Sequence, residues 1–199
     1  MMPLFLNTHK TQSVRVQKGL TLDRVNHIYL RATYSEWINT KLLNAICELT
    51  EEVADPMDDD IHAVINLMNQ SVMADSVWLK RFAVRSSILA DAITEITNET
   101  GRPISPSSFG FSDLALNRQS LDKAITYWST SVLVHELDDF LQYICSDGHS
   151  QEKNFFTAIM HFFNHQAFVR EKMISQLIMK KINFHVTDLL VPHACQLEI

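Results

Sequence analysis

Glycine and proline are scarce in this sequence, which holds four glycines and five prolines in 199 residues. An all-β protein of this length would need many more turns, and these two residue types build most turns. Apolar residues make up 46% of the chain and charged residues 20%, as is typical of a globular protein. The length fits one domain, so we expect residues 1–199 to form a single domain of the all-α class.

Cysteine and long apolar runs are also scarce. The three cysteines, Cys47, Cys145 and Cys195, are odd in number and have no CxxC spacing. This argues against a disulfide framework or a zinc knuckle and favours reduced thiols. Cys47 lies in an apolar helical stretch and is expected to be a small core residue. No run approaches the roughly 20 apolar residues of a membrane span, and Met1–Leu6 is too short for a signal peptide. We therefore expect a cytoplasmic protein without membrane attachment.

Positive charge is not in excess, since the formal net charge is −6. Nucleic-acid binding needs clustered lysines and arginines that neutralise phosphates, and no sustained basic face is present. The acidic run Asp58–Asp60 lacks the alternation and the glycine of a calcium loop. It is interpreted as the start of a helix, where carboxylates complement the helix dipole. We expect no nucleic-acid partner.

Apolar residues recur at helical spacing over four long segments. Serines near 86–87 and 129–131 are expected to interrupt two of these helices, and Asp147-Gly148 is a turn signal. Residues 1–22 show no helical period and are expected to form a non-helical arm, and residues 184–199 a tail. Gly101–Gly110 is the clearest loop. The sequence predicts a four-helix bundle without a substantial sheet, with helices near residues 24–53, 58–98, 112–143 and 150–182.

His161 and His165 form the densest polar cluster on an apolar helix. Residues four apart project from the same helix face, which is the spacing that two imidazoles need to share a metal ion. A transition-metal site needs at least a third ligand, usually from another helix. No GxSxG, phosphate-binding glycine loop or Cys–His signature is present, so the catalytic residues, if any, are unknown.

Three segments carry a resemblance to a known family. The first is YSEWIN at residues 34–39 followed by KLL, and the second is LMNQSVMADSVW at residues 67–78. The third is HFFNHQAFVREK at residues 161–172, followed by VTDL at residues 186–189, and RQSLD at residues 118–122 adds a shorter match. In this order they resemble the DinB superfamily of DinB/YfiT-like metalloenzymes, which implies a four-helix bundle.

In that family three histidines hold a metal such as nickel or zinc, and by position they correspond to Gln70, His165 and Val169. Valine cannot ligate a metal, and a glutamine carbonyl is a poor replacement for imidazole. The resemblance therefore implies the fold but not the metal, and no cofactor is expected. Gln70, His165, Val169 and His161 are then the expected lining of a ligand pocket, with His165 hydrogen-bonded in the core. A shifted nickel or zinc site on His161 and His165 would need a third ligand, and the two candidates are Asp75 and His62.

Two functions follow from the resemblance. The first is a DinB-like protein with a degenerate metal site that binds a small molecule or serves a structural role. The alternative is a metal-dependent enzyme of the DinB/YfiT type, a thiol S-transferase or a hydrolase, with a shifted metal site. Relatives in this family are often dimers, so a homodimer is expected.

Overall fold

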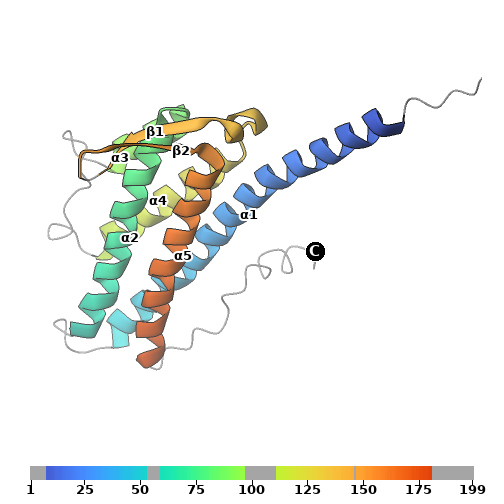
Figure 1. Ribbon diagram of the computed structural model, residues 1–199. Coiled ribbons are helices and arrows are strands. Elements are labelled where there is room, and N and C mark those ends of the chain that lie inside the picture. Colours follow the sequence, from blue (N-terminus) through green and yellow to red (C-terminus); the bar gives the residue numbers. More distant parts are fainter. Residues whose placement is uncertain (1–7, 53–58, 97–110, 146, 181–199) are drawn as a thin grey trace, which may run out of the picture.

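The computed structural model describes residues 8–52, 59–96, 111–145 and 147–180, and the side chains of residues 24–50, 61–94, 111–145 and 147–180. The described chain is mainly helical (Figure 1). The helices and strands are α1 (Thr8–Glu52), α2 (Asp59–Ala83), α3 (Ser87–Ile96), α4 (Phe111–Ser129), the 3₁₀ helix η2 (Val134–Asp138), β1 (Phe140–Ile144), β2 (Ser150–Asn154) and α5 (Phe155–Met179).

Helices α1, α2, α4 and α5 pack around one hydrophobic core. Helix α1 contacts α4 and α5, α2 contacts α5, and α3 lies against α2 and α4. The aromatic centre of the core is Phe82, whose ring stacks on Trp128 at 5.5 Å. Phe155 and Phe162 meet the same ring edge-on at 5.6 and 5.7 Å. Side chains from α2, α4 and α5 thus interlock at one point, which fixes these helices relative to each other.

Helix α1 begins at Thr8, so the expectation of a non-helical arm up to residue 22 is wrong from Thr8 onward. Figure 1 shows the N-terminal part of α1 projecting away from the other helices. An apolar period marks a helix that packs against a core, but a helix that projects into solvent does not require one. Once a helix is nucleated, each further residue adds one hydrogen bond at little cost. Residues 8–23 contain no proline to stop this extension.

The break expected near residues 86–87 is confirmed. Helix α2 ends at Ala83 and α3 starts at Ser87. Between them the backbone N–H of Arg85 donates to the carbonyl of Phe82 at 2.9 Å, and that of Ser86 donates to Ala83 at 3.2 Å. These turns close the end of α2 and let the chain change direction.

The interruption expected near residues 129–131 is confirmed, because α4 ends at Ser129, but the helix expected from there to residue 143 is wrong. The hydroxyls of Ser129, Thr130 and Ser131 each donate to a carbonyl three residues earlier, at 2.6 to 2.8 Å. Such local bonds take the place of continuing backbone bonds and help to end the helix. The chain then forms η2 and the strand β1.

A hairpin replaces the start of the helix expected from residue 150. Strands β1 and β2 pair antiparallel, with Phe140 opposite Asn154 and Ile144 opposite Ser150. The predicted turn at Asp147-Gly148 is confirmed, because the Asp147 side chain accepts from the backbone N–H of His149 at 3.0 Å. Helix α5 therefore begins only at Phe155, after the cap Asn154, whose side chain accepts from the backbone N–H of Thr157.

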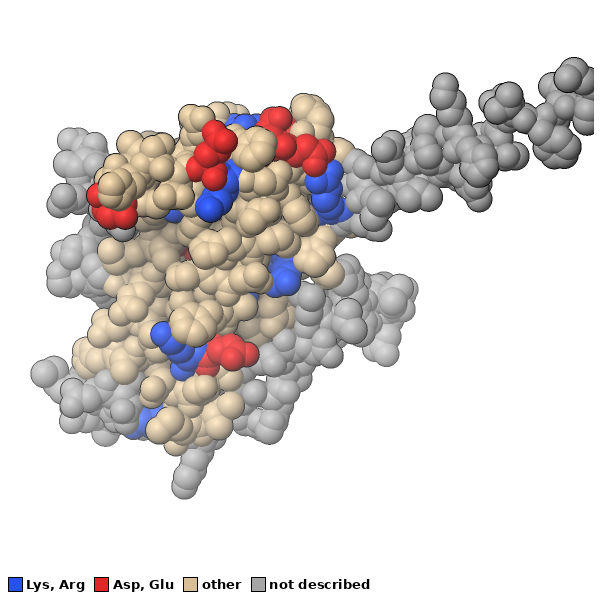
Figure 2. All heavy atoms as spheres, in the orientation of Figure 1, with Lys and Arg blue, Asp and Glu red and all other residues tan. Residues whose placement is uncertain are grey.

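The expected loop at 101–110, the acidic residue Asp58 and the tail at 184–199 lie outside the described residues. Cys47 is exposed, so its expected place in the core is wrong, and neither Cys47 nor Cys145 forms a disulfide within the described part of the chain. Charged side chains of both signs gather at the hairpin end on the face drawn in Figure 2. None of the helices in the described ranges combines the length and apolar character needed to cross a bilayer.

Candidate functional site: a buried polar network beside a cavity

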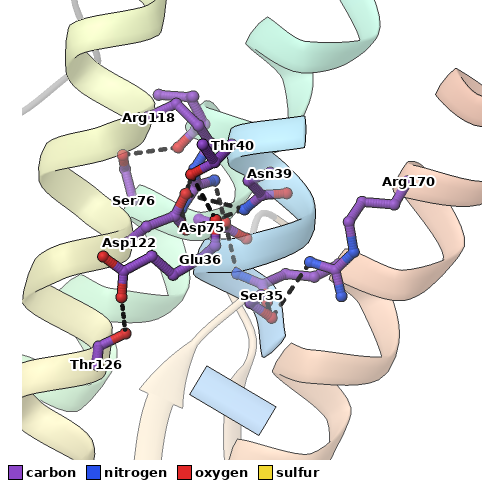
Figure 3. Close-up of polar contacts among 12 residues, drawn as sticks. Ser35, Glu36, Asn39, Thr40, Asp75, Ser76, Arg118, Asp122, Thr126 and Arg170 are labelled. Carbon is purple, nitrogen blue, oxygen red and sulfur yellow. Dashed lines mark hydrogen bonds and ion pairs between the residues drawn. The ribbon is translucent and has the colours of Figure 1, made fainter. Parts of the chain in front are cut away.

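A network of buried polar side chains crosses the core and draws on all four of the packed helices (Figure 3). Each of these side chains is at least 96% buried. Its members are Ser35 and Asn39 on α1, Asp75 on α2, Arg118 and Asp122 on α4, and Gln166 and Arg170 on α5.

Arg118 is the centre of this network and is fully buried. Its Nε and Nη2 donate to the two oxygens of Asp122 at 3.1 and 2.8 Å, which is a bidentate pair. Its Nη1 donates to Asp75 Oδ2 at 2.5 Å. Asn39 Nδ2 donates to both oxygens of Asp122, at 2.9 and 3.1 Å. Two carboxylates and one guanidinium thus satisfy one another without water.

Burial sets the electrostatics of the network. Burial works against the charge of Arg118, but Asp122 and Asp75 outweigh it, so the pKa of Arg118 is raised. Burial raises the pKa of Asp122 from 3.8 to about 6, although Arg118 and Asn39 favour its ionised form. Burial therefore opposes the charged forms of both Arg118 and Asp122, and their mutual attraction and hydrogen bonds act against it.

Gln166 links this ion pair to α1. Its Nε2 donates to Asp75 Oδ2 at 2.8 Å, and its Oε1 accepts from the Ser35 hydroxyl at 2.9 Å. Ser35 Oγ in turn accepts from Arg170 Nη1 at 3.3 Å. The chain of bonds runs from Arg118 through Asp75, Gln166 and Ser35 to Arg170, as Figure 3 partly shows. The orientation of Arg170 is thus tied to the rigid core.

A cavity of about 310 Å³ lies where this chain of bonds ends, between α1 and α5. Arg170, which is only 4% exposed, forms part of its wall. The lining residues are Tyr34, Ile38, Ala167, Arg170, Glu171, Ile174 and Ser175. Cavities of this size are at the lower end of the range that holds small ligands.

Arg170 differs from Arg118 in its partners. The ion pairs within the described part of the chain include none at Arg170. Its guanidinium lies 5.6 Å from the centre of the Tyr34 ring. Burial lowers the pKa of Arg170 to about 10, while Tyr34, Asp75 and Asp122 act in the opposite direction. Arg170 is therefore still a cation at neutral pH, and it borders a cavity without a directly bound carboxylate.

The residues expected to line a ligand pocket lie on α2 and α5. Gln70 and His161 are exposed, His165 is half-buried, and Val169 belongs to the hydrophobic core. The His161 ring packs against Trp78 with 5.1 Å between centroids. The cavity beside Arg170 is lined by none of these four side chains.

His165 was expected to be a hydrogen-bonded core histidine. Its place in the core is wrong, because His165 is half-buried. Of the candidates for a third ligand of a shifted site, Asp75 is occupied by Arg118 and Gln166, and His62 is exposed on α2. The described ranges contain no group of three or more His, Cys, Asp or Glu side chains arranged to hold a metal ion.

No role was predicted from the sequence for four residues of this network, although they lie in the segments that resemble the family: Ser35, Asn39, Gln166 and Arg170. A signal was nevertheless present: Ser35 and Asn39 are four apart, as are Gln166 and Arg170 and also Arg118 and Asp122. Polar residues at this spacing on apolar helices lie on one face. Three such pairs on three helices indicate a shared buried network.

In comparisons with known proteins, no family model, no curated protein and no solved structure matches this chain.

Proposed function

We propose that this chain is a small-ligand-binding protein that has the four-helix bundle of the DinB superfamily without its metal site. The observation that carries the proposal is the position of Arg170, a buried cation on the wall of a 310 Å³ cavity. A buried charge without a paired counter-charge is costly, and a ligand that pairs with it recovers part of this cost. The surrounding network holds Arg170 in place before a ligand arrives.

Binding without catalysis is favoured by the position of the two carboxylates. Asp75 and Asp122 are closed off by Arg118, Asn39 and Gln166. A general base must lie within hydrogen-bonding reach of the proton that it removes. Neither of these two buried carboxylates lines the cavity, so neither is placed to act on a molecule bound there, and the acidic residue that does line it, Glu171, is exposed.

The proposal includes no metal site of the family's kind, because two of the three corresponding positions lack a suitable donor atom. Val169 offers no lone pair and lies in the core, and Gln70 is exposed. Of the three positions that correspond to the family's ligands, only His165 has an imidazole. One imidazole does not hold nickel or zinc tightly.

The alternative is a metal-dependent enzyme of the DinB/YfiT type, a thiol S-transferase or a hydrolase. It is supported by the spacing of His161 and His165, which both reach the surface of α5 at least in part. Such an enzyme would need a third ligand from another part of the chain.

We also propose that the protein forms a homodimer, as the resemblance implies. Met73 and Val77 on α2 are 38% and 44% exposed, and Phe140 and Ile144 on β1 are 60% and 70% exposed. Helix α2 contacts β1, and Arg81 Nη2 lies 3.4 Å from the carbonyl of Ile144. Large apolar side chains therefore lie on neighbouring elements of the surface, as is common at subunit interfaces.

A screen of small molecules by ligand-observed NMR tests the binding function. Ala167 lines the cavity, so Ala167→Leu should fill it and abolish the binding of any molecule that the wild-type protein takes up there. Ala115→Leu is the matched control, since Ala115 lies on α4 and does not line the cavity. Binding that survives Ala167→Leu unchanged, or the absence of any bound molecule, would overturn the proposal.

A further inference from the structure

We infer that the ligand of the cavity between α1 and α5 is a small aliphatic monocarboxylate whose anionic end pairs with Arg170. This inference rests on the proposed ligand-binding function and names the chemical class of the ligand. Three features of the cavity point to this class: the charge on its wall, the apolar part of its lining and one acidic side chain in the same lining.

The charge on the wall selects an anion. Only 4% of the surface of Arg170 is exposed, and Arg170 has no ion pair among the described residues. A guanidinium presents a planar fork of N–H groups that matches a carboxylate, and a neutral or cationic ligand cannot make such a pair. Because the guanidinium is screened from water by burial, this interaction is stronger than it would be at the surface.

The orientation of Arg170 is fixed in the protein before a ligand binds. Its Nη1 donates to Ser35 Oγ, and the Ser35 hydroxyl donates to Gln166 Oε1. Gln166 is anchored in turn on Asp75, which is paired with Arg118. A ligand that meets this guanidinium does not have to order a flexible side chain, so less of the interaction energy is lost on binding.

The remaining lining combines an apolar part with polar side chains and one acidic residue. Ile38, Ala167 and Ile174 form the apolar part, against which a short hydrocarbon chain can pack, and Tyr34 and Ser175 are the polar neighbours of Arg170 in the lining. The acidic residue is Glu171, which is exposed. A dianion such as phosphate or a dicarboxylate would have its second charge near this group, and like charges repel. The volume of about 310 Å³ limits the ligand to a small molecule.

Isothermal titration of the wild-type protein at pH 7.5 tests the inference with four probes: sodium hexanoate, 1-hexanol, hexylamine and inorganic phosphate. We expect hexanoate to bind at least about tenfold more tightly than hexanol or hexylamine, because only the carboxylate pairs with a charged donor. Phosphate should bind more weakly than hexanoate. This comparison needs no variant, so it does not depend on whether a substitution at a buried site folds.

Two variants locate the effect. Arg170→Gln should reduce the affinity for hexanoate by at least about tenfold and leave the affinity for hexanol nearly unchanged. Arg24→Gln removes the same charge on the surface, where Arg24 is paired with Asp138, and should leave hexanoate binding unchanged. Circular dichroism checks that each variant is folded.

The outcomes separate this inference from the proposed function. If hexanol or hexylamine binds as tightly as hexanoate, and Ala167→Leu abolishes that binding, the cavity binds ligands but the inference of a carboxylate is wrong. If phosphate binds more tightly than hexanoate, the ligand is a phosphate and the inference is also wrong. If no probe binds and the NMR screen finds no other ligand, both the inference and the proposed function fail.

Discussion

At the scale of single residues, Arg118 is the central charge of the buried polar network. It is fully buried and forms ion pairs with both Asp75 and Asp122. Removing one partner of a buried ion pair leaves an uncompensated charge in the core. This lowers stability more than replacing the whole pair by apolar residues does. When Arg118 is replaced, the side chains of the described residues that still donate hydrogen bonds to these two carboxylates are Asn39 and Gln166.

We therefore expect Arg118→Met to lower the free energy of unfolding by about 3–5 kcal/mol, measured by urea denaturation. Arg24→Met is the control, since Arg24 pairs with the exposed Asp138 at the surface, and its loss should be a small fraction of that value. Similar losses in the two variants would show that the buried network does not stabilise the fold in this way.

The pH dependence of stability depends on Asp122. Its pKa is raised to about 6 from 3.8, so between these pH values the folded protein binds more protons at Asp122 than the unfolded chain. The stability that this group contributes is fully present below pH 3.8 and is lost as the pH rises through about 6. This direction is opposite to that of a carboxylate whose pKa is lowered by an ion pair.

Urea denaturation of the wild-type protein and of Asp122→Asn between pH 4 and pH 7 tests this direction, because Asn does not titrate. The difference between their free energies of unfolding, wild type minus variant, should fall as the pH rises to about 6 and then stay constant. A difference that increases with pH would mean that Arg118 lowers the pKa of Asp122 below its ordinary value.

At the scale of elements, the hairpin of β1 and β2 depends on one glycine. Gly148 has a φ angle of 84°, in the left-handed region that favours glycine, and no other atom lies within 4 Å of the position of a Cβ. A side chain there meets no neighbour, so its cost is conformational.

Gly148→Ala should lower the free energy of unfolding by about 1 kcal/mol, as measured by urea denaturation. Gly148→Asn is the matched variant and should cost less, because asparagine tolerates this conformation better than alanine. An equal loss in the two variants would mean that the backbone angle is not the source of the cost.

The elements also show which local signals were readable from the sequence. The apolar stripe from Arg24 onward correctly predicts helix up to Glu52, although the helix begins at Thr8, and the serine break before α3 is also correct, because both signals are visible in single segments. The hairpin was not predicted, since the segment Phe140–Ile144 has only five residues and the helix was expected to continue through most of it. Strand pairing depends on a partner, which no single segment displays.

The candidate site was less predictable than the fold for the same reason. Arg170 and Ser35 lie 135 residues apart in sequence, and only packing of α1 against α5 brings them together. The histidines drew attention because imidazoles have a known metal chemistry. The cavity is lined instead by Arg170 and a mixture of apolar and polar residues, whose role depends on their burial and neighbours in the fold.

At the scale of the whole molecule, the surface carries apolar side chains that are not covered within the described structure. Those on α2 and β1, such as Val77 and Ile144, motivate the proposed homodimer. Light scattering at micromolar concentration should give twice the mass of one chain, which is 22.9 kDa.

Val77→Lys together with Ile144→Lys should shift the particle to 22.9 kDa, because charge on both elements opposes burial at an interface. Leu116→Lys is the control, since Leu116 is an exposed apolar residue of α4. A wild-type particle of 22.9 kDa would contradict the proposed homodimer without affecting the ligand site.

The central claim is that this protein binds a small ligand and lacks the family's metal site. The most direct test compares how much hexanoate, nickel and zinc each raise its free energy of unfolding. At a free hexanoate concentration of 100 times its dissociation constant, binding to the folded state alone should raise the free energy of unfolding by about 2.7 kcal/mol. Nickel and zinc should produce no comparable gain in the same urea denaturation experiment. The account is contradicted if either metal stabilises the wild-type protein, hexanoate does not, and His161→Ala abolishes the gain from the metal.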